Sequence, residues 1–524
     1  MARSKALAVQ TVFVTLLSFL GLLLGLGNSL LIAYLYGASP ERDAYLLAAI
    51  VPTYLVSLFS GNISILFIPV FIQNHTKDEP QAWRFASSII CYSGLILLAI
   101  VALATTFAKD VVARLAPAFT PAELDLTTRL LRVMMPSALF GGLSSVASSL
   151  YYAEQRFLRP NITALLAGSL PLITNLTLHH RMGMFSLAWG TTLGSAAGLL
   201  LLLPGLLAPG KLRFSLNARE DGILNLLRSS VPLLLASLLY RFNTGFERIL
   251  GARLPTGSIS FLAYATQIVT MLSSLTSSGI ATTFFPALSR AFASNDMPGA
   301  RRYLAIGVRA VLIVALPASV LLIVFAHPIV QLLLERGAFD RRATSGVSNS
   351  ILLLLAGYVA SSLGNVVTKC IYVAQKTAWL APYTIIETIG YVALGAWLSK
   401  YFSYLGLAAA SSARDCISVS LYLAASSYLM GGIQGREMWL DAAKLVASSL
   451  VMAISVLPLR WWLAQQSPNR LTSLVVLCLS GVIAGAVYFV MTVRVFRIEE
   501  GVRMFSAIAA RLPGLKRLVP SSRV

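Results

Sequence analysis

The chain has 524 residues, of which 57% are hydrophobic and only 12% are charged. About a quarter of the residues of a soluble protein are charged. This composition therefore excludes a soluble protein and indicates a protein surrounded by lipid. Lys and Arg outnumber Asp and Glu by 41 to 20, but they are scattered through short connecting segments, so we expect no nucleic-acid partner. Membrane proteins collect Lys and Arg in their cytoplasmic loops, which explains the excess of positive charge.

Apolar runs of about twenty residues recur along the whole chain, and each is long enough to cross a bilayer as a helix. They predict an all-α integral membrane protein of about fourteen transmembrane helices. In chain order the predicted helices are Ala8–Tyr36, Ala44–Gln73, Phe85–Ala108, Leu130–Ala153, Asn161–Leu178, Met184–Leu207, Leu224–Leu250, Ser258–Leu288, Tyr303–Phe325, Ser345–Val373, Ala378–Tyr401, Tyr404–Met430, Asp441–Leu463 and Arg470–Val495.

These helices fall into two sets of six and a final pair. If the N-terminus is cytoplasmic, the inside segments collect roughly twice as many Lys and Arg as the outside ones, so we expect both termini to be cytoplasmic. The predicted segments are an N-terminal six-helix bundle over 1–210, a cytoplasmic linker over 211–223, a C-terminal six-helix bundle over 224–432, two additional helices over 433–497 and a basic cytoplasmic tail over 498–524.

The two sets of six contain similar strings at a nearly constant separation. Pro69 and Pro286 stand in similar Phe-rich strings 217 residues apart, and Pro160 and Pro382 follow similar polar strings 222 residues apart. Such spacing favours an internal duplication, although apolar sequences also resemble one another by chance because their alphabet is small. A repeat with an even number of helices is a parallel repeat, so we expect two bundles around a central cavity and transport by alternating access.

A few ionisable residues fall inside the predicted spans, where each costs a few kcal/mol and marks a candidate functional site. They are Arg241, Glu247, Arg248, Lys369, Glu387, Arg414 and Asp415. Arg241 and Arg248 are two helical turns apart and share one face, so they are candidates for holding an anionic head group, as is Lys369. The alternatives are that Arg248 extends to the membrane surface and that Arg241 pairs with an acidic residue. Arg414 and Asp415 are adjacent, so we expect each to have a partner elsewhere.

Four strings together resemble the MurJ/MviN family, which belongs to the superfamily of multidrug, oligosaccharidyl-lipid and polysaccharide exporters. They are Gly37–Tyr45, Pro255–Ser260, Pro286–Phe292 and Glu335–Phe339. The resemblance implies a fourteen-helix flippase of the bacterial cytoplasmic membrane that moves an undecaprenyl-pyrophosphate-linked saccharide, which is lipid II in the best-known members. It also implies that the last two helices form a groove for the lipid tail.

The chain departs from this family in the expected cavity lining. The family's arginines on helices one, two and eight correspond to Asn28–Ser29, Ile50 and Thr266–Gln267 here, all of them neutral. Asn28 and Gln267 would therefore face the substrate without supplying charge. A neutral side chain cannot replace a guanidinium group that pairs with a diphosphate. Either other residues of this chain hold the diphosphate, or the cargo differs from lipid II.

The resemblance also implies a sodium site. Glu247 stands where the family carries an Asp, and Glu387 with Ser411 or Ser412 would complete a set of oxygen ligands for a hard cation. Proton binding by the two glutamates is an equally good coupling device. A structural salt bridge between Glu387 and Lys369 is the third alternative.

Four functions remain open at this point. A flippase for a lipid-linked saccharide other than lipid II comes first, then lipid II itself, then a cation-coupled exporter of drugs or metabolites, and last a membrane scaffold without transport activity. Expected partners are the lipid-linked saccharide, membrane lipids and glycan-assembly enzymes. The sequence has no nucleotide-binding loop, metal cluster or nucleophile arrangement, so we expect neither an enzyme nor a cofactor, beyond coupling to Na⁺ or H⁺.

Overall fold

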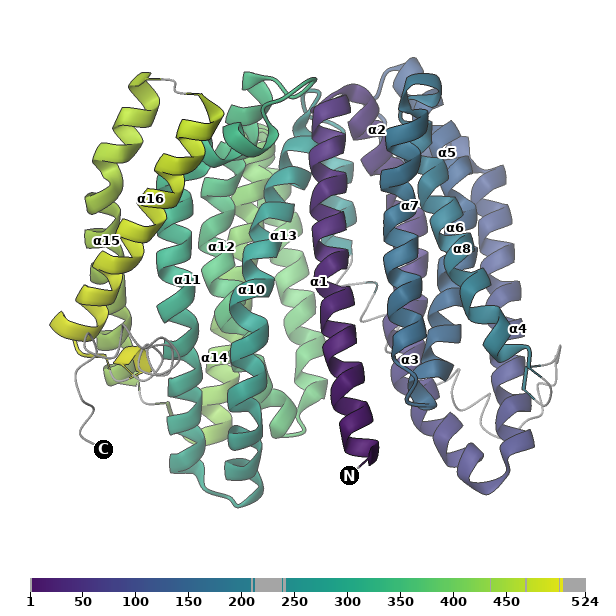
Figure 1. The fold of residues 1–524 in the computed structure, drawn as a ribbon, viewed down its shortest axis with the longest axis horizontal. Helices are drawn as coiled ribbons and strands as arrows, with labels where there is room; N and C mark the ends of the chain where they lie inside the picture. Colours follow the sequence, from purple (N-terminus) through teal and green to yellow (C-terminus); the bar gives the residue numbers. More distant parts are fainter. Residues whose placement is uncertain are drawn as a thin grey trace. The chain divides into compact units, whose positions relative to one another are not determined.

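A computed structural model of the protein describes residues 2–208, 211–212, 238, 242–433, 435–466, 469–498 and 500–502. Within these residues every regular element is a helix (Figure 1), and the predicted all-α class is confirmed. The chain divides into two compact units. Unit 1 contains Met1–Ser260 and Arg336–Phe339, and unit 2 contains Phe261–Glu335 and Asp340–Val524.

The centre of unit 1 is α6, which packs against α3, α4 and α8. Its N-terminus has a capping box, in which Thr120 and Glu123 satisfy each other's backbone N–H groups. Aromatic side chains such as Trp83 and Phe67 fill the core beside it. The helices are α1 (Ala2–Tyr36), α2 (Pro40–Ala48), α3 (Ile50–Lys77), α4 (Glu79–Thr106), α5 (Ala108–Leu115), α6 (Pro121–Ala153), α7 (Leu158–Met182) and α8 (Phe185–Leu206); residues 242–250 are also helical.

In unit 2 the helix α12 packs against both α11 and α14, and α15 packs against α11 and α16. The first three residues of α10 belong to unit 1 and the rest to unit 2. The helices are α10 (Ser258–Ala293), α11 (Met297–Leu334), α12 (Arg341–Val373), the short 3₁₀ helix Thr377–Trp379, α13 (Leu380–Phe402), α14 (Tyr404–Met430), α15 (Gly435–Gln466), α16 (Arg470–Phe489) and the π-helical turn Val490–Val495.

Two details of the predicted helices were wrong. The single helix Ala44–Gln73 is two helices, α2 and α3, because Pro52 has no N–H to donate to the carbonyl of Ala48 and the helix is interrupted just before it. The short helix α5 was missed, because its charged residues resemble a loop; only one face of it, with Ala108 and Val112, is buried.

Ten helices in the described part of the chain are long and apolar enough to cross a membrane. The long helices α10, α13 and α14 are not among the ten, and they carry polar residues such as Gln267, Glu387 and Asp415. Three of the helices that hold candidate site residues thus fall outside the ten, whereas α1 with Asn28 and α12 with Lys369 are among them. The predicted linker and helix over 211–250 lie largely outside the described residues, so those boundaries stay predictions.

Candidate functional site

The clearest polar arrangement in unit 1 is built on the short helix α2. Ser39 caps this helix, Pro40 begins it, and Asp43 lies one turn further with only 5% of its surface exposed. The Asp43 carboxylate accepts hydrogen bonds from the backbone N–H groups of Gly257 (2.7 Å) and Ser260 (2.9 Å) and from the Ser260 hydroxyl (2.5 Å). It thus satisfies the N–H of Ser260 in the first turn of α10, which that helix cannot satisfy itself, and the N–H of Gly257 just before the helix begins.

Arg248 adds a second bond to the same helix. Its Nη1 donates to the carbonyl oxygen of Leu46 at 2.6 Å, which is one of the last four carbonyls of α2 and needs a donor from outside an ideal helix. Arg248 thus bonds within unit 1, and the alternative in which it extends to the membrane surface stays a prediction. We call the set of Asp43, Arg248, Leu46, Gly257 and Ser260 the α2 clasp.

A third segment packs tightly against the start of this region. The N–H of Ala338 donates to the carbonyl of Tyr34 at 2.8 Å. Gly37 and Gly337 have φ angles of +55° and +57°, and a Cβ at either would overlap a carbonyl oxygen of the other segment. Three of the four strings that carried the family resemblance thus have residues in one region of unit 1, where they hold the backbone in place.

Asp43 was missed as a functional candidate by sequence reasoning, because it precedes the first predicted residue of its helix. Its partner Gly257 lies 214 residues away in the sequence, so no local pattern reveals the contact. The available signal was an acidic residue in a string that resembles a family motif.

The remaining candidates for substrate contact fall into both units. Asn28 of α1 is partly buried, and its Oδ1 accepts no hydrogen bond from the described residues. Gln267 of α10 is partly exposed in unit 2. Arg241 lies outside the described residues, so the pairing of Arg241 with Arg248 stays a prediction.

Lys369 of α12 lies against aromatic rings. Its Nζ is 5.8 Å from the centre of the Phe285 ring and 5.5 Å from that of Tyr372, close enough for cation–π attraction. Among the ion pairs of the described residues none includes Lys369, so the alternative salt bridge to Glu387 does not occur there. This ammonium group has ring partners and no carboxylate partner in the part of the chain that is described.

A polar cluster connects α13 and α14 in unit 2. Glu387 is buried, with 8% of its surface exposed, and the hydroxyls of Ser418 and Tyr422 lie within hydrogen-bonding reach of its carboxylate. Its Oε1 still accepts no hydrogen bond from the described residues. The carboxylate therefore has an oxygen in place to bind a proton or a cation.

The expectation that Arg414 and Asp415 each need a distant partner was wrong. Nε and Nη2 of Arg414 both reach Oδ1 of Asp415, at 3.0 and 2.7 Å. The helical offset of adjacent residues applies to their Cβ atoms, but the long Arg side chain folds back across the helix surface. Its guanidinium also lies 5.4 Å from the centre of the Tyr391 ring.

The serine candidates lie in the packed contact between α12 and α14. The Ser412 hydroxyl donates to the Leu353 carbonyl (2.5 Å) and accepts from the Gly357 N–H (3.1 Å), two groups that bond directly in a regular helix. Ser411 is buried next to it. Glu247 lies in unit 1, whereas both serines lie in unit 2, so a shared cation site stays a prediction.

Arg309 of α11 is a further ionisable residue that sequence reasoning missed, although it lies inside a predicted span. Its guanidinium is 2.9 Å from a carboxylate oxygen of Asp441 in α15 and 2.9 Å from one of Glu500. Only 13% of its side chain is exposed. These ion pairs hold α15 and the segment after α16 to α11.

Comparison with known proteins gives consistent matches. The family model described as lipid II flippase MurJ matches residues 32–482. A probable lipid II flippase MurJ of Buchnera aphidicola subsp. Schizaphis graminum is 26% identical over 415 residues, which cover 78% of this chain and 81% of that protein. A lipid II flippase MurJ of Burkholderia cenocepacia is 25% identical over 415 residues, covering 73% of this chain and 80% of that protein.

Solved structures agree on the fold. A lipid II flippase MurJ in an inward closed conformation has a TM-score of 0.80 at 22% identity and covers 93% of this chain and 99% of its own. An inward-facing multidrug resistance transporter of the MATE family has a TM-score of 0.65 at 14% identity, covering 78% of this chain and 94% of its own. At these identities the likeness shows the fold alone.

Proposed function

The chain belongs to the lipid II flippase MurJ family, and on this premise we propose that it moves an undecaprenyl-pyrophosphate-linked saccharide across the cytoplasmic membrane by alternating access. It is a multi-pass membrane transporter of this family and not an enzyme. Lipid II, the cargo in the names of its relatives, is the first cargo to test.

The observation that carries the proposal is Lys369, an ammonium group in a membrane helix with aromatic partners only among the described residues. The helix α12 has 33 residues, about 50 Å at 1.5 Å per residue, so it exceeds the roughly 30 Å apolar layer. Lys369 lies about one turn from the end at Val373, which the predicted orientation puts on the cytoplasmic side. The diphosphate of an incoming lipid-linked saccharide would lie at this depth, where it would supply the missing negative charge.

The test is rescue of a bacterial strain depleted of its own lipid II flippase. We expect the wild-type chain to rescue growth and Lys369→Ala to fail, because a diphosphate loses a charged contact worth about 1.5–3 kcal/mol. Lys376→Ala removes the same charge just beyond the same end of α12, where the side chain is exposed, and should rescue normally. Lys369→Arg should retain part of the activity. Full rescue by Lys369→Ala at equal protein level would refute this role.

A second cargo is favoured by the neutral residues Asn28 and Gln267, which stand where the family resemblance predicts arginines. We propose a lipid-linked saccharide other than lipid II as the alternative cargo. The two cargoes can be distinguished in proteoliposomes. One preparation contains labelled lipid II, and a second contains another labelled undecaprenyl-diphosphate oligosaccharide. Translocation of the second lipid without the first would select the alternative.

For coupling we propose that Glu387 binds Na⁺ or H⁺ during each cycle. Its buried carboxylate keeps an oxygen that accepts no hydrogen bond from the described residues, and carboxylate oxygens suit both ions. Transport by Glu387→Gln in proteoliposomes should no longer respond to an imposed sodium or pH gradient, whereas the exposed Glu79→Gln should respond like wild type. An unchanged response in Glu387→Gln would exclude this residue as the coupling group.

A further inference from the structure

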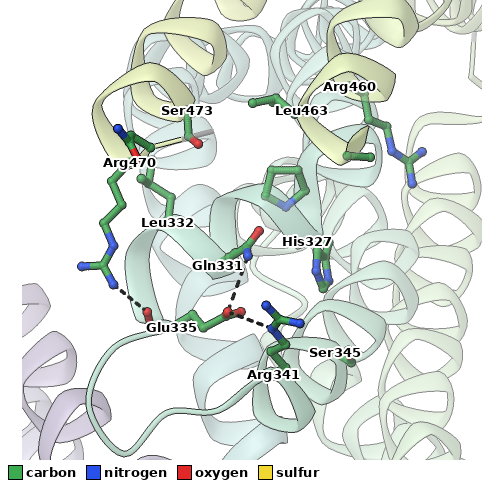
Figure 2. A pocket seen from close by; sticks show the side chains of 13 residues that line it. His327, Gln331, Leu332, Glu335, Arg341, Ser345, Arg460, Leu463, Arg470 and Ser473 are labelled. Carbon is green, nitrogen blue, oxygen red and sulfur yellow. Dashed lines mark hydrogen bonds and ion pairs between the residues drawn. The ribbon is translucent and has the colours of Figure 1, made fainter. Parts of the chain in front are cut away.

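A cavity of about 700 Å³ lies in unit 2 at the neighbouring ends of α11, α12, α15 and α16 (Figure 2). Its lining includes three arginines, Arg341, Arg460 and Arg470, together with His327 and a single carboxylate, Glu335. With a neutral histidine these groups carry a net charge of two positive. The cavity is unrelated to the candidate residues described above, and its charge selects for an anion.

The negative charge of Glu335 is partly engaged. Its Oε2 accepts a hydrogen bond from the Thr344 hydroxyl at 2.8 Å, and its Oε1 is 3.9 Å from Nε of the exposed Arg341. Arg470 donates a hydrogen bond to the backbone carbonyl of Glu335 at 3.1 Å. Among the described residues it forms no ion pair with the Glu335 carboxylate. Arg460 makes no hydrogen bond or ion pair with any residue in the described ranges. Two guanidinium groups, on opposite sides of the cavity in Figure 2, thus lack a carboxylate partner there.

The surroundings of the cavity indicate a lipid environment. Trp461 and Trp462 follow Arg460 on α15 and are 64% and 38% exposed, and tryptophan gathers where the apolar layer of a membrane meets the head groups. Further along, large apolar side chains such as Ile454 of α15 and Leu474 of α16 are exposed. Arg460 is therefore at head-group depth, next to a surface that acyl chains would cover.

We propose that this cavity binds the anionic, phosphate-bearing head group of a membrane lipid. A volume of about 700 Å³ falls within the range of pockets that enclose small ligands. Guanidinium groups bind phosphate oxygens through paired, charge-assisted hydrogen bonds. The lipid tails lie along the exposed apolar surfaces of α15 and α16. The orientation predicted from charge puts this end of unit 2 in the outer leaflet, so the lipid is either a phospholipid or a translocated lipid-linked diphosphate.

The test uses the full-length protein, purified in detergent, and native mass spectrometry of lipid binding. Phosphatidylglycerol should bind about tenfold or more tightly than diacylglycerol, which has the same tails and no phosphate. Arg460→Ala should abolish that difference. Since Arg460 contacts no described side chain by hydrogen bond or ion pair, the variant should fold, and its unfolding midpoint checks this. Arg460→Lys should retain more affinity than Arg460→Ala.

The matched control is Arg342→Ala, which removes an exposed charge next to Arg341 at the same membrane surface but outside the cavity lining. This variant should bind phosphatidylglycerol like wild type. Undecaprenyl diphosphate distinguishes the sources: tighter binding than phosphatidylglycerol, with the same dependence on Arg460, would identify the diphosphate carrier as the ligand. The proposal is overturned if Arg460→Ala binds phosphatidylglycerol as well as wild type does. Inorganic pyrophosphate displacing the lipids at equal concentration would also overturn it, because the tails would then contribute nothing.

Discussion

Replacing Asp43 by alanine should destabilise unit 1 more than any ordinary loss of a helix cap. The substitution leaves two buried backbone donors, the N–H groups of Gly257 and Ser260, without their acceptor. Each buried unpaired donor costs about 1–3 kcal/mol, so we expect a loss of about 2–6 kcal/mol. The Ser260 hydroxyl can rotate to another acceptor and is left out of this sum. Asp43→Asn keeps one carbonyl oxygen and should lose about half as much.

The assay is equilibrium unfolding of the detergent-solubilised protein, followed by tryptophan fluorescence. Asp296→Ala is the matched control, because Asp296 caps α11 through a single hydrogen bond to the Gly299 N–H and is exposed; its loss should cost about 1 kcal/mol. If Asp43→Ala is no more destabilising than Asp296→Ala, water replaces the carboxylate at no cost and the reasoning about the α2 clasp is wrong.

Two further substitutions test tight packing and buried charge by the same unfolding assay. Gly337→Ala should destabilise more than Gly431→Ala: both residues have φ above +50°, which costs about 1–2 kcal/mol for alanine, but a Cβ at Gly337 would overlap the Tyr34 carbonyl oxygen, whereas at Gly431 it meets only the flexible end of the Arg301 side chain, 3.1 Å away. Equal losses would show that the segment at Gly337 moves freely. Arg309→Ala should cost about 3–5 kcal/mol, because it leaves the buried Glu500 carboxylate without the cation that pairs with it among the described residues; a loss below 1 kcal/mol would mean that water reaches this site.

Features with a local cause were predictable from the sequence. The apolar runs identified the helices, and the end of α12 at Val373 and the whole of α14 were predicted at the observed residues. The break before Pro52 also had a local cause, which the proline itself signals, but its position between two apolar runs hid it. Lys369 and Glu387 could be named in advance because an ionisable residue is conspicuous in an apolar run.

The interaction partners of these residues could not be predicted from the sequence. One of the three alternatives drawn from the sequence was a salt bridge between Glu387 and Lys369, whereas Lys369 lies against aromatic rings and Glu387 faces hydroxyl groups. Arg414 and Asp415 were expected to separate and instead form a pair. Partner choice depends on where neighbouring helices pack and how far a long side chain reaches, and neither follows from spacing along one helix.

By itself the sequence determined that this chain is an all-α membrane protein of the flippase family, because hydrophobicity, helix length and family motifs are properties of contiguous residues. Only the tertiary structure decided what the motifs do: it joined Asp43 to Gly257 across 214 positions and placed Arg341, Arg460 and Arg470 around one cavity. The physical reason is that helix packing brings together residues far apart in the chain, and the burial of a polar group, with its cost, is fixed only once its neighbours are in place.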